Sequence, residues 1–157
     1  MENERHYDKV GFLTMLKISR ADYDLIRGQA EQSYPQEGCG ILLGSGATGC
    51  RSVSSIFPCN NAHPEPLRRY RIDPLQVIAA QKLARSQGMD IIGFYHSHPD
   101  HPAQYSETDL AEAYWLDCSY VITCVDQGYA AQTRSFVLSG SEDNRKFVEE
   151  EIEIVEA

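Results

Sequence analysis

The chain has 157 residues, of which 42% are hydrophobic and 24% are charged, and this composition predicts one compact domain with a hydrophobic core. Its 14 Lys and Arg against 23 Asp and Glu give a formal net charge of −9, which repels phosphate backbones and excludes nucleic acid as an expected partner. The apolar stretches are far shorter than the roughly 20 residues that span a bilayer, so no membrane partner is expected.

The N-terminal part predicts a strand followed by a helix. Residues 1–11 form a polar segment without the basic and apolar regions of a secretory signal, so export is not expected. Phe12–Ile18 predicts a short strand. Ser19 is suited to cap a helix over Ala21–Ser33, which has apolar residues on one face and ends before Pro35.

The middle of the chain predicts a hairpin and a second helix. Gly38–Gly44 and Arg51–Phe57 have strand composition, and the Gly-rich segment between them suits a hairpin. After a loop, Arg69–Ile72 is predicted to extend as a strand. Asp73 is a suitable N-cap and Pro74 a suitable first residue for a helix that ends at the next glycine.

The following segments predict the centre of the sheet. Asp90–His96 is almost continuously apolar, as expected for a central strand that is buried on both faces. Ser106 is suited to cap a helix over Glu107–Leu116. Strands are predicted at Tyr120–Val125 and Thr133–Leu138.

The C-terminal tail is acidic. Residues 142–157 carry seven carboxylates against two basic residues, and such runs are most often solvated. Within Lys146–Val155 the apolar residues recur every second position, which favours a strand over the helix that the Glu content also permits. Together the elements predict a single α/β domain over residues 12–155, with a mixed β-sheet flanked by helices.

The five cysteines predict a reducing, cytoplasmic location. They form an odd set with no Cys-x-x-Cys pair, which argues against a disulfide framework and against a Cys-rich zinc module. Cys39 and Cys118 lie in apolar or Gly-rich surroundings, so both are predicted to be packing residues rather than nucleophiles.

Possible metal ligands gather around residues 96–109. His96 and His98 are two positions apart on an extended chain, so both imidazoles point to one face and can converge on one ion. Asp109 follows Ser106 by about one helical turn, and a loop that folds back would bring it against the histidines. Two imidazoles and one carboxylate are a typical catalytic zinc shell, although iron, cobalt or manganese also suits such a site.

A hydrolytic metal site also needs a group that moves protons. Zinc lowers the pKa of a bound water towards ~7, and a carboxylate must still shuttle protons. Glu37, at a predicted strand start beside glycines, is the candidate. The hydroxyl of Ser106 is suited to donate to the oxyanion of a tetrahedral intermediate.

Each of these residues also has a simpler interpretation. The two histidines could merely end a strand, Glu37 alone could be a solvated carboxylate, and Ser106-x-x-Asp109 is also an ordinary helix capping box. A cap and a metal ligand are compatible, because the cap fixes the helix end that aims the aspartate.

Together, Glu37, His96-x-His98 and Ser106-x-x-Asp109 resemble the complete signature of the JAMM (MPN+) metalloproteases, which carry the JAB domain. Further segments resemble the compact bacterial members of this family: Tyr34–Gly44, Asn60–Ala62, Tyr70–Pro74 and Gly93–Pro99. The resemblance covers roughly residues 12–155.

The resemblance implies the JAB/MPN fold, which is related to the cytidine deaminase fold. It implies zinc on His96, His98 and Asp109, with Glu37 as the general acid/base that activates zinc-bound water. It further implies hydrolysis of the amide bond after the C-terminal Gly-Gly of a ubiquitin-like protein, with sulfur carriers as the partners of the compact bacterial members.

The sequence departs from the family pattern at two points. Tyr105 stands where the family commonly has proline before the motif serine. The insertions with which eukaryotic members grip ubiquitin chains are absent, so selectivity for one ubiquitin linkage is not expected.

Two rival functions remain open. A non-catalytic MPN-type module could bind a ubiquitin-like partner without cleaving it, although retention of the whole signature disfavours this. A nucleobase or nucleoside deaminase would need H-x-E and P-C-x-x-C elements, which the sequence lacks. The oligomeric state, the substrate protein and the leaving group stay undetermined.

Two basic features lie near the signature. His101 could contact substrate or a second ion, although a solvated loop histidine is the simpler interpretation. The cluster of Arg68, Arg69 and Arg71 could hold a substrate carboxylate, or could mark an exposed strand edge.

Overall fold

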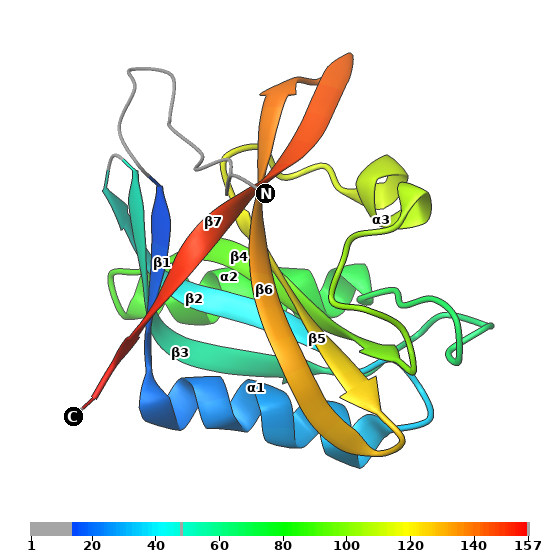
Figure 1. Ribbon diagram of the computed structural model, residues 1–157. Helices are drawn as coiled ribbons and strands as arrows, with labels where there is room; N and C mark the ends of the chain where they lie inside the picture. The colour runs from blue at the N-terminus through cyan, green and yellow to red at the C-terminus, as the bar shows by residue number, and fades with distance from the viewer. Residues whose placement is uncertain (1–13, 48, 157) are drawn as a thin grey trace.

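The computed structural model describes residues 14–47 and 49–156 and contains seven strands and three helices in that range (Figure 1). In chain order these are β1 (Met15–Ser19), α1 (Arg20–Ser33), β2 (Cys39–Ala47), β3 (Cys50–Cys59), α2 (Pro74–Ser86), β4 (Asp90–Pro99), α3 (Glu107–Glu112), β5 (Ser119–Asp126), β6 (Tyr129–Ser141) and β7 (Asn144–Val155).

The strands form one mixed sheet that closes into a barrel in the order β1-β3-β2-β4-β5-β6-β7. β1 pairs in parallel with both β3 and β7, β4 pairs in parallel with β5, and the remaining pairs are antiparallel. The mixed sheet with flanking helices is therefore confirmed, but its closure was not predicted. It arises because the acidic tail forms the strand β7, which reaches across to β1 and pairs Ile152 with Leu16.

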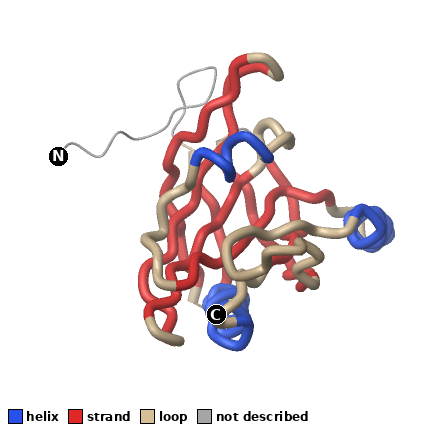
Figure 2. The backbone as a smooth tube through the Cα atoms, turned by 90° about the vertical axis from the view of Figure 1, so that its right-hand side faces the viewer, coloured by secondary structure: helices blue, strands red, loops and turns tan. Residues whose placement is uncertain are grey.

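Strand β4 is central, as predicted, and is buried over almost its whole length. On one of its faces, residues from β1, α1, β2 and β5 pack around Ile92 and Tyr95 beneath α1. On the other face, Phe94 belongs to a larger cluster that includes Ile41, Ile122 and Phe136. Figure 2 shows α1 and α2 at separate places outside the strands. The two rows of side chains on β4 are thus held in fixed, opposite directions.

The helix starts follow the predicted caps. Ser19 accepts a hydrogen bond from the N–H of Asp22, and Asp73 accepts one from the N–H of Leu75. The hairpin of β2 and β3 and the late strand β7 are also as predicted. Of the strand predicted over Phe12–Ile18, residues 12 and 13 lie outside the described part of the chain, as does the segment 1–11.

Two predicted elements are wrong. Arg69–Ile72 is not a strand, because the side chain of Asn61 takes backbone groups that a ladder would need: it donates to the carbonyl of Arg69 and accepts from the N–H of Arg71.

The second wrong prediction concerns the C-terminal end of helix α3, which ends at Glu112 instead of Leu116. Arg145 of β7 donates to the carbonyl of Ala113. The N–H of Trp115 donates to the hydroxyl of Tyr120, and the N–H of Asp117 to the carbonyl of Leu138. These tertiary contacts replace the bonds that would continue the helix.

A buried polar network joins four strands. Arg51 Nη2 lies 3.1 Å from Glu150 Oε1, and Arg51 Nε donates to Ser119 Oγ over 2.8 Å. The hydroxyls of Ser119 and Ser135 donate to Glu150 Oε2 over 2.6 and 2.8 Å. One carboxylate of the acidic tail is therefore a structural partner inside the barrel and not a solvated charge.

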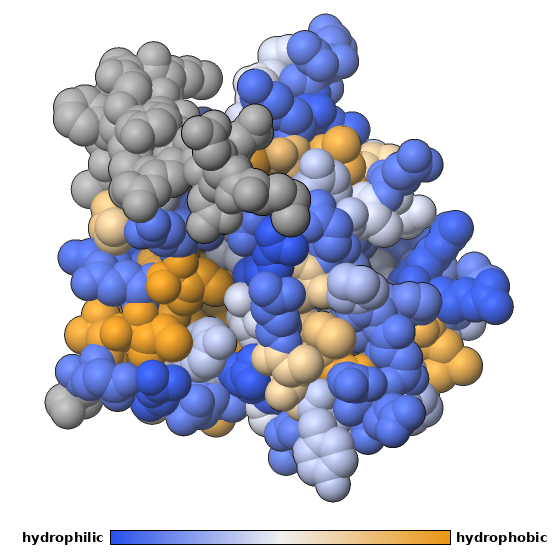
Figure 3. All heavy atoms as spheres, viewed as in Figure 1, coloured by the Kyte–Doolittle hydropathy of each residue, from blue (hydrophilic) through white to orange (hydrophobic). Residues whose placement is uncertain are grey.

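The face seen in Figure 3 is mostly hydrophilic, and the largest of its hydrophobic areas lies near β1 and β7. No described helix has the length and apolar character needed to cross a bilayer. The cytoplasmic location stays a prediction, as does kinship with the cytidine deaminase fold.

Candidate metal centre

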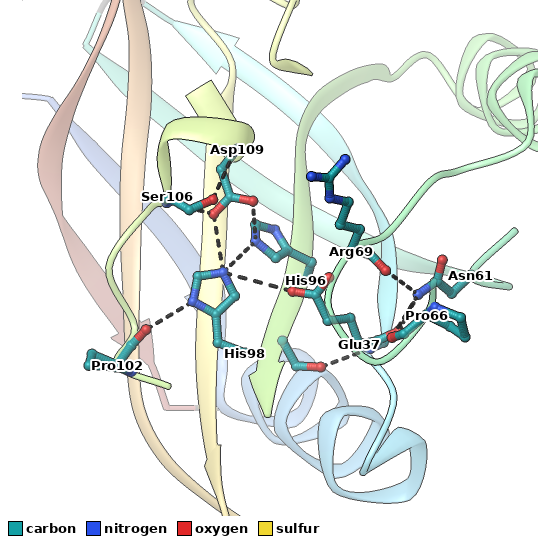
Figure 4. Close-up of polar contacts among 11 residues, drawn as sticks. Glu37, Asn61, Pro66, Arg69, His96, His98, Pro102, Ser106 and Asp109 are labelled. Atoms are coloured by element: carbon teal, nitrogen blue, oxygen red, sulfur yellow. Dashed lines mark hydrogen bonds and ion pairs between the residues drawn. The ribbon is translucent and has the colours of Figure 1, made fainter. Parts of the chain in front are cut away.

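His96 and His98 converge at the end of β4, as their spacing predicts (Figure 4). Their Nε2 atoms lie 3.1 Å apart, and both rings are buried. Nδ1 of His98 lies 2.9 Å from the carbonyl oxygen of Pro102, which can only accept, so Nδ1 carries the proton. In the neutral ring, Nε2 then presents a lone pair to the centre, which is the form that binds metals.

Asp109 faces both histidines from the first turn of α3. Its Oδ1 lies 3.3 Å from Nε2 of His96, and its Oδ2 lies 3.1 Å from Nε2 of His98. The capping box is also present: Ser106 Oγ accepts from the N–H of Asp109 over 3.0 Å, and Asp109 Oδ2 accepts from the N–H of Ser106 over 2.9 Å. The cap thus fixes the aspartate in the position that points it at the rings.

Glu37 lies just before β2, with only 5% of the residue exposed. Its Oε1 is 4.0 Å from Nε2 of His98, and its Oε2 has no hydrogen-bond partner among the described residues. Burial raises the pKa of Glu37 to about 7, with His98 opposing the shift and Asp109 adding to it. A carboxyl group of this kind is suited to both take up and release a proton near neutral pH.

The charges of the cluster depend on one another. Burial lowers the pKa of His96 below its ordinary value, and Asp109 offsets this only in part. At His98 burial acts in the same direction, but the hydrogen bond to Asp109 leaves the pKa raised. Burial raises the pKa of Asp109, but the two histidines outweigh it and hold the carboxyl well below its usual range. Asp109 is therefore a carboxylate at neutral pH.

The donor set fits a divalent metal ion. Glu37, His96 and His98 each offer a ligand atom within 4.8 Å of the others, and Asp109 contacts both rings. The distances favour Asp109 as the third ligand, because Asp109 lies within 3.3 Å of both rings, whereas Glu37 comes no closer than 4.0 Å to His98. Two imidazoles and a carboxylate are the protein ligands of a typical catalytic zinc site.

The loop over residues 61–71 holds the site together, and its role was not predicted. Asn61 Nδ2 donates to the carbonyls of Glu37 and Arg69 over 3.0 and 2.9 Å, and the N–H of Glu37 donates to the carbonyl of Pro66 over 2.8 Å. Tyr70 of the same loop stacks on His96, with ring centroids 4.3 Å apart. Because this loop is irregular, neither helical nor strand periodicity could have placed it; matching family segments at Asn60–Ala62 and Tyr70–Pro74 were its only signal.

The basic residues near the signature lie beside the site. Arg68, Arg69 and His101 line a cavity of about 590 Å³ together with Glu37 and His98. Residues 68–71 form no strand, so the interpretation of the three arginines as a strand edge is wrong, and substrate contact stays open for them and for His101.

The cysteines take no part in the candidate centre. All five are free, and Cys39 and Cys118 are buried, as predicted. Burial raises the pKa of the Cys39 thiol to about 12 and that of the Cys118 thiol to about 11, so both are protonated at neutral pH. Such thiols are poor nucleophiles.

Comparison with known proteins agrees with this geometry. A family model described as prokaryotic homologs of the JAB domain matches residues 19–139. A probable TtuB-protein conjugate cleaving protease of Thermus thermophilus is 35% identical over 112 residues, covering 71% of this chain and 72% of that protein. A desampylase of Haloferax volcanii is 36% identical over 92 residues, 59% of this chain and 65% of that protein. A CysO-cysteine peptidase of Mycobacterium tuberculosis is 26% identical over 141 residues, 88% of this chain and 91% of that protein.

Solved structures share the fold. A protein of Desulfitobacterium hafniense superimposes with a TM-score of 0.78 at 29% identity, covering 91% of this chain and 94% of that one. A JAB1/MPN domain protein from Archaeoglobus fulgidus superimposes with a TM-score of 0.55 at 22% identity, covering 89% of this chain and 96% of that one. At that identity the second likeness bears on the fold alone.

Proposed function

The chain belongs to the prokaryotic JAB family, and we propose that it is a zinc-dependent metallopeptidase that hydrolyses the amide bond after the C-terminal Gly-Gly of a ubiquitin-like sulfur carrier. One observation carries the proposal: the buried Nε2 atoms of His96 and His98 lie 3.1 Å apart and face the carboxylate of Asp109. Three relatives support the substrate class, since their names specify cleavage of TtuB-protein conjugates, a desampylase and a CysO-cysteine peptidase.

His96, His98 and Asp109 would hold the metal. When bound, zinc supplies Lewis-acid activation of water and of the scissile carbonyl. The hydrogen bond from His98 Nδ1 to Pro102 keeps the ring oriented and, in the neutral ring, leaves Nε2 as the nitrogen available to the metal. The capping box of α3 likewise fixes the direction in which the carboxylate of Asp109 points.

Glu37 is the general acid/base in this proposal. Its Oε1 takes a proton from the attacking water and delivers it to the nitrogen of the leaving amine as the amide bond breaks. Burial of the carboxyl group and the absence of a partner for Oε2 among the described residues support this role. Ser106 Oγ accepts from Asp109, so its own hydroxyl proton is available to the oxyanion of the tetrahedral intermediate.

The test is mass spectrometry of a ubiquitin-like sulfur carrier, such as TtuB, extended by several residues beyond its Gly-Gly. Zinc-loaded protein should release the extension by cleavage after the second glycine. Chelator treatment should abolish the cleavage, and Glu37→Gln should slow it by about 10²- to 10⁴-fold.

Two results would contradict the proposal in different ways. An intact substrate together with one bound zinc per chain would favour the rival function, a non-catalytic module that binds a ubiquitin-like partner. An intact substrate without bound metal would overturn the assignment of the metal ligands.

A further inference from the structure

A second cavity of about 360 Å³ adjoins the candidate metal centre. It shares Tyr70, Asp109 and Glu112 with the cavity of about 590 Å³ that holds Glu37 and His98. The two cavities therefore meet at Asp109, one of the candidate metal ligands. The second cavity is also within the size range of small-ligand sites, ~300–1,000 Å³.

The second cavity is lined mainly by aromatic and aliphatic side chains. Phe94 lies two residues before His96 on β4, so the two side chains share a face of the strand. Trp115 meets the Phe94 ring edge-on at 5.3 Å between centroids, and Tyr120 lies 5.5 Å from it. Ile72 also lines this cavity. We refer to Ile72, Phe94, Trp115 and Tyr120 as the aromatic pocket.

Contacts from other elements hold one wall of the aromatic pocket in place. The hydroxyl of Tyr120 accepts from the N–H of Trp115 over 3.2 Å. Arg145 of β7 donates to the carbonyl of Ala113, and its guanidinium lies 4.6 Å from the ring centroid of Tyr114 at the cavity edge. These contacts fix the wall, which reduces the entropic cost of filling the pocket.

We propose that the aromatic pocket is a specificity subsite that takes a large apolar side chain of the substrate close to the scissile bond. This inference rests on the peptidase function proposed above. Two residues of an extended strand span ~6.6 Å, and this is the separation along β4 between Phe94 and the ligand His96. Because the bond after the second glycine is cleaved at the metal centre, a side chain in the pocket belongs to a substrate residue close to that bond. The occupant is therefore the residue before Gly-Gly, or one of the first two residues of the leaving group.

Charges around the aromatic pocket sharpen this choice. Asp109 and Glu112 lie at the junction of the two cavities, with Arg71 also at the pocket. An acidic side chain would face these two carboxylates against the single charge of Arg71, and would leave the apolar wall uncovered. We therefore expect Leu or Phe to be preferred over Ala, and Asp to be rejected most strongly.

Binding can be tested without turnover, because Trp115 is the only tryptophan of the chain and its emission reports on the pocket. Zinc-loaded Glu37→Gln protein would be titrated with labelled, Trp-free ten-residue peptides centred on Gly-Gly. The peptides carry Ala, Asp, Leu or Phe at one of the three positions named above. Leu or Phe at one position should bind at least ten-fold more tightly than Asp and shift the emission of Trp115. Equal affinities by fluorescence anisotropy, or binding that leaves the emission unchanged, would overturn the subsite.

Cleavage provides the second test, with the same substitutions placed in the extended carrier. Ile72→Asp should lower kcat/KM for the Leu and Phe substrates by about 10- to 200-fold and raise it for a Lys substrate, a gain that misfolding cannot produce. Leu25→Asp is the matched control, because Leu25 is 60% exposed on α1 and lies outside both cavities. Normal turnover with the same kcat/KM for all substituted carriers would refute the subsite alone. No cleavage of any extended carrier would refute the proposed function.

Discussion

Nδ1 of His98 lies 2.9 Å from the carbonyl oxygen of Pro102, and this contact determines which ring nitrogen faces Asp109. Because a backbone carbonyl can only accept, Nδ1 keeps its proton, and in the neutral ring the lone pair of Nε2 points to the centre. In that form, His98 turns a nitrogen suited to a metal ion towards Asp109. The site is buried, so the lone pair of Nε2 and the carboxylate of Asp109 would repel each other without a cation between them.

Replacement of the two carboxylates should separate metal binding from turnover. Asp109→Asn removes the only carboxylate among the described residues that contacts both rings. It should therefore weaken zinc binding by more than ~10- to 100-fold, the loss typical when a residue that hydrogen-bonds to a metal ligand is replaced. Glu37→Gln should keep one zinc per chain. Competition with a chromogenic chelator measures both affinities, and wild-type affinity in Asp109→Asn would contradict the ligand assignment.

Glu37→Gln should instead lower kcat by about 10²- to 10⁴-fold, the range for loss of a general acid/base. The amide preserves the size of the side chain but cannot accept the proton of the attacking water. Glu142→Gln, at an exposed position, is a matched control that should keep wild-type kcat. Cleavage of the extended carrier at the wild-type rate by Glu37→Gln would rule out this role.

Asn61 should act as a positioning residue for Glu37. Asn61→Ala removes the donors to the carbonyls of Glu37 and Arg69, and should lower kcat by about 10- to 100-fold with zinc stoichiometry unchanged. A purely structural role would instead lower the free energy of unfolding while kcat per folded, zinc-loaded molecule stayed at the wild-type value. Kinetics normalised to bound zinc distinguishes the two.

The buried pair of Arg51 and Glu150 should be essential to the closed barrel. Glu150→Ala leaves the guanidinium without its partner, and we expect a loss of about 3–5 kcal/mol in the free energy of unfolding. The double variant Arg51→Met/Glu150→Leu removes both charges and should be closer to wild type. Urea unfolding measures both variants, and equal losses in the single and double variants would contradict this explanation.

The buried thiols should make stability fall at alkaline pH. Burial raises the pKa of Cys39 to about 12 and of Cys59 and Cys118 to about 11, whereas free thiols in the unfolded chain ionise near 8.5. Their contribution is complete below the unfolded pKa and is lost as pH rises towards the folded value, at up to about 1.4 kcal/mol per pH unit for each thiol. Urea unfolding between pH 8 and 10.5 under reducing conditions should show a shallower decline in Cys118→Ala. Identical slopes would contradict burial of this thiol in its neutral form.

Local patterns in the sequence determined most of the elements and the candidate ligands. Ser19 and Asp73 cap their helices because a short polar side chain next to free N–H groups needs no distant partner. The spacing of His96 and His98 places both rings on one face for an equally local reason, the two-residue period of a strand. The JAB family is likewise recognisable from the identity and spacing of a few signature residues, which are properties of the sequence alone.

Only the tertiary structure decided features that depend on contacts between distant segments. The barrel closes because β7 pairs with β1, and α3 stops at Glu112 because Arg145, far along the chain, binds the carbonyl of Ala113. Asn61 turns the expected strand at Arg69–Ile72 into a loop that holds Glu37. Sequence periodicity cannot predict such effects, because each arises from a side chain or strand that lies at least eight residues away along the chain and competes for backbone hydrogen bonds.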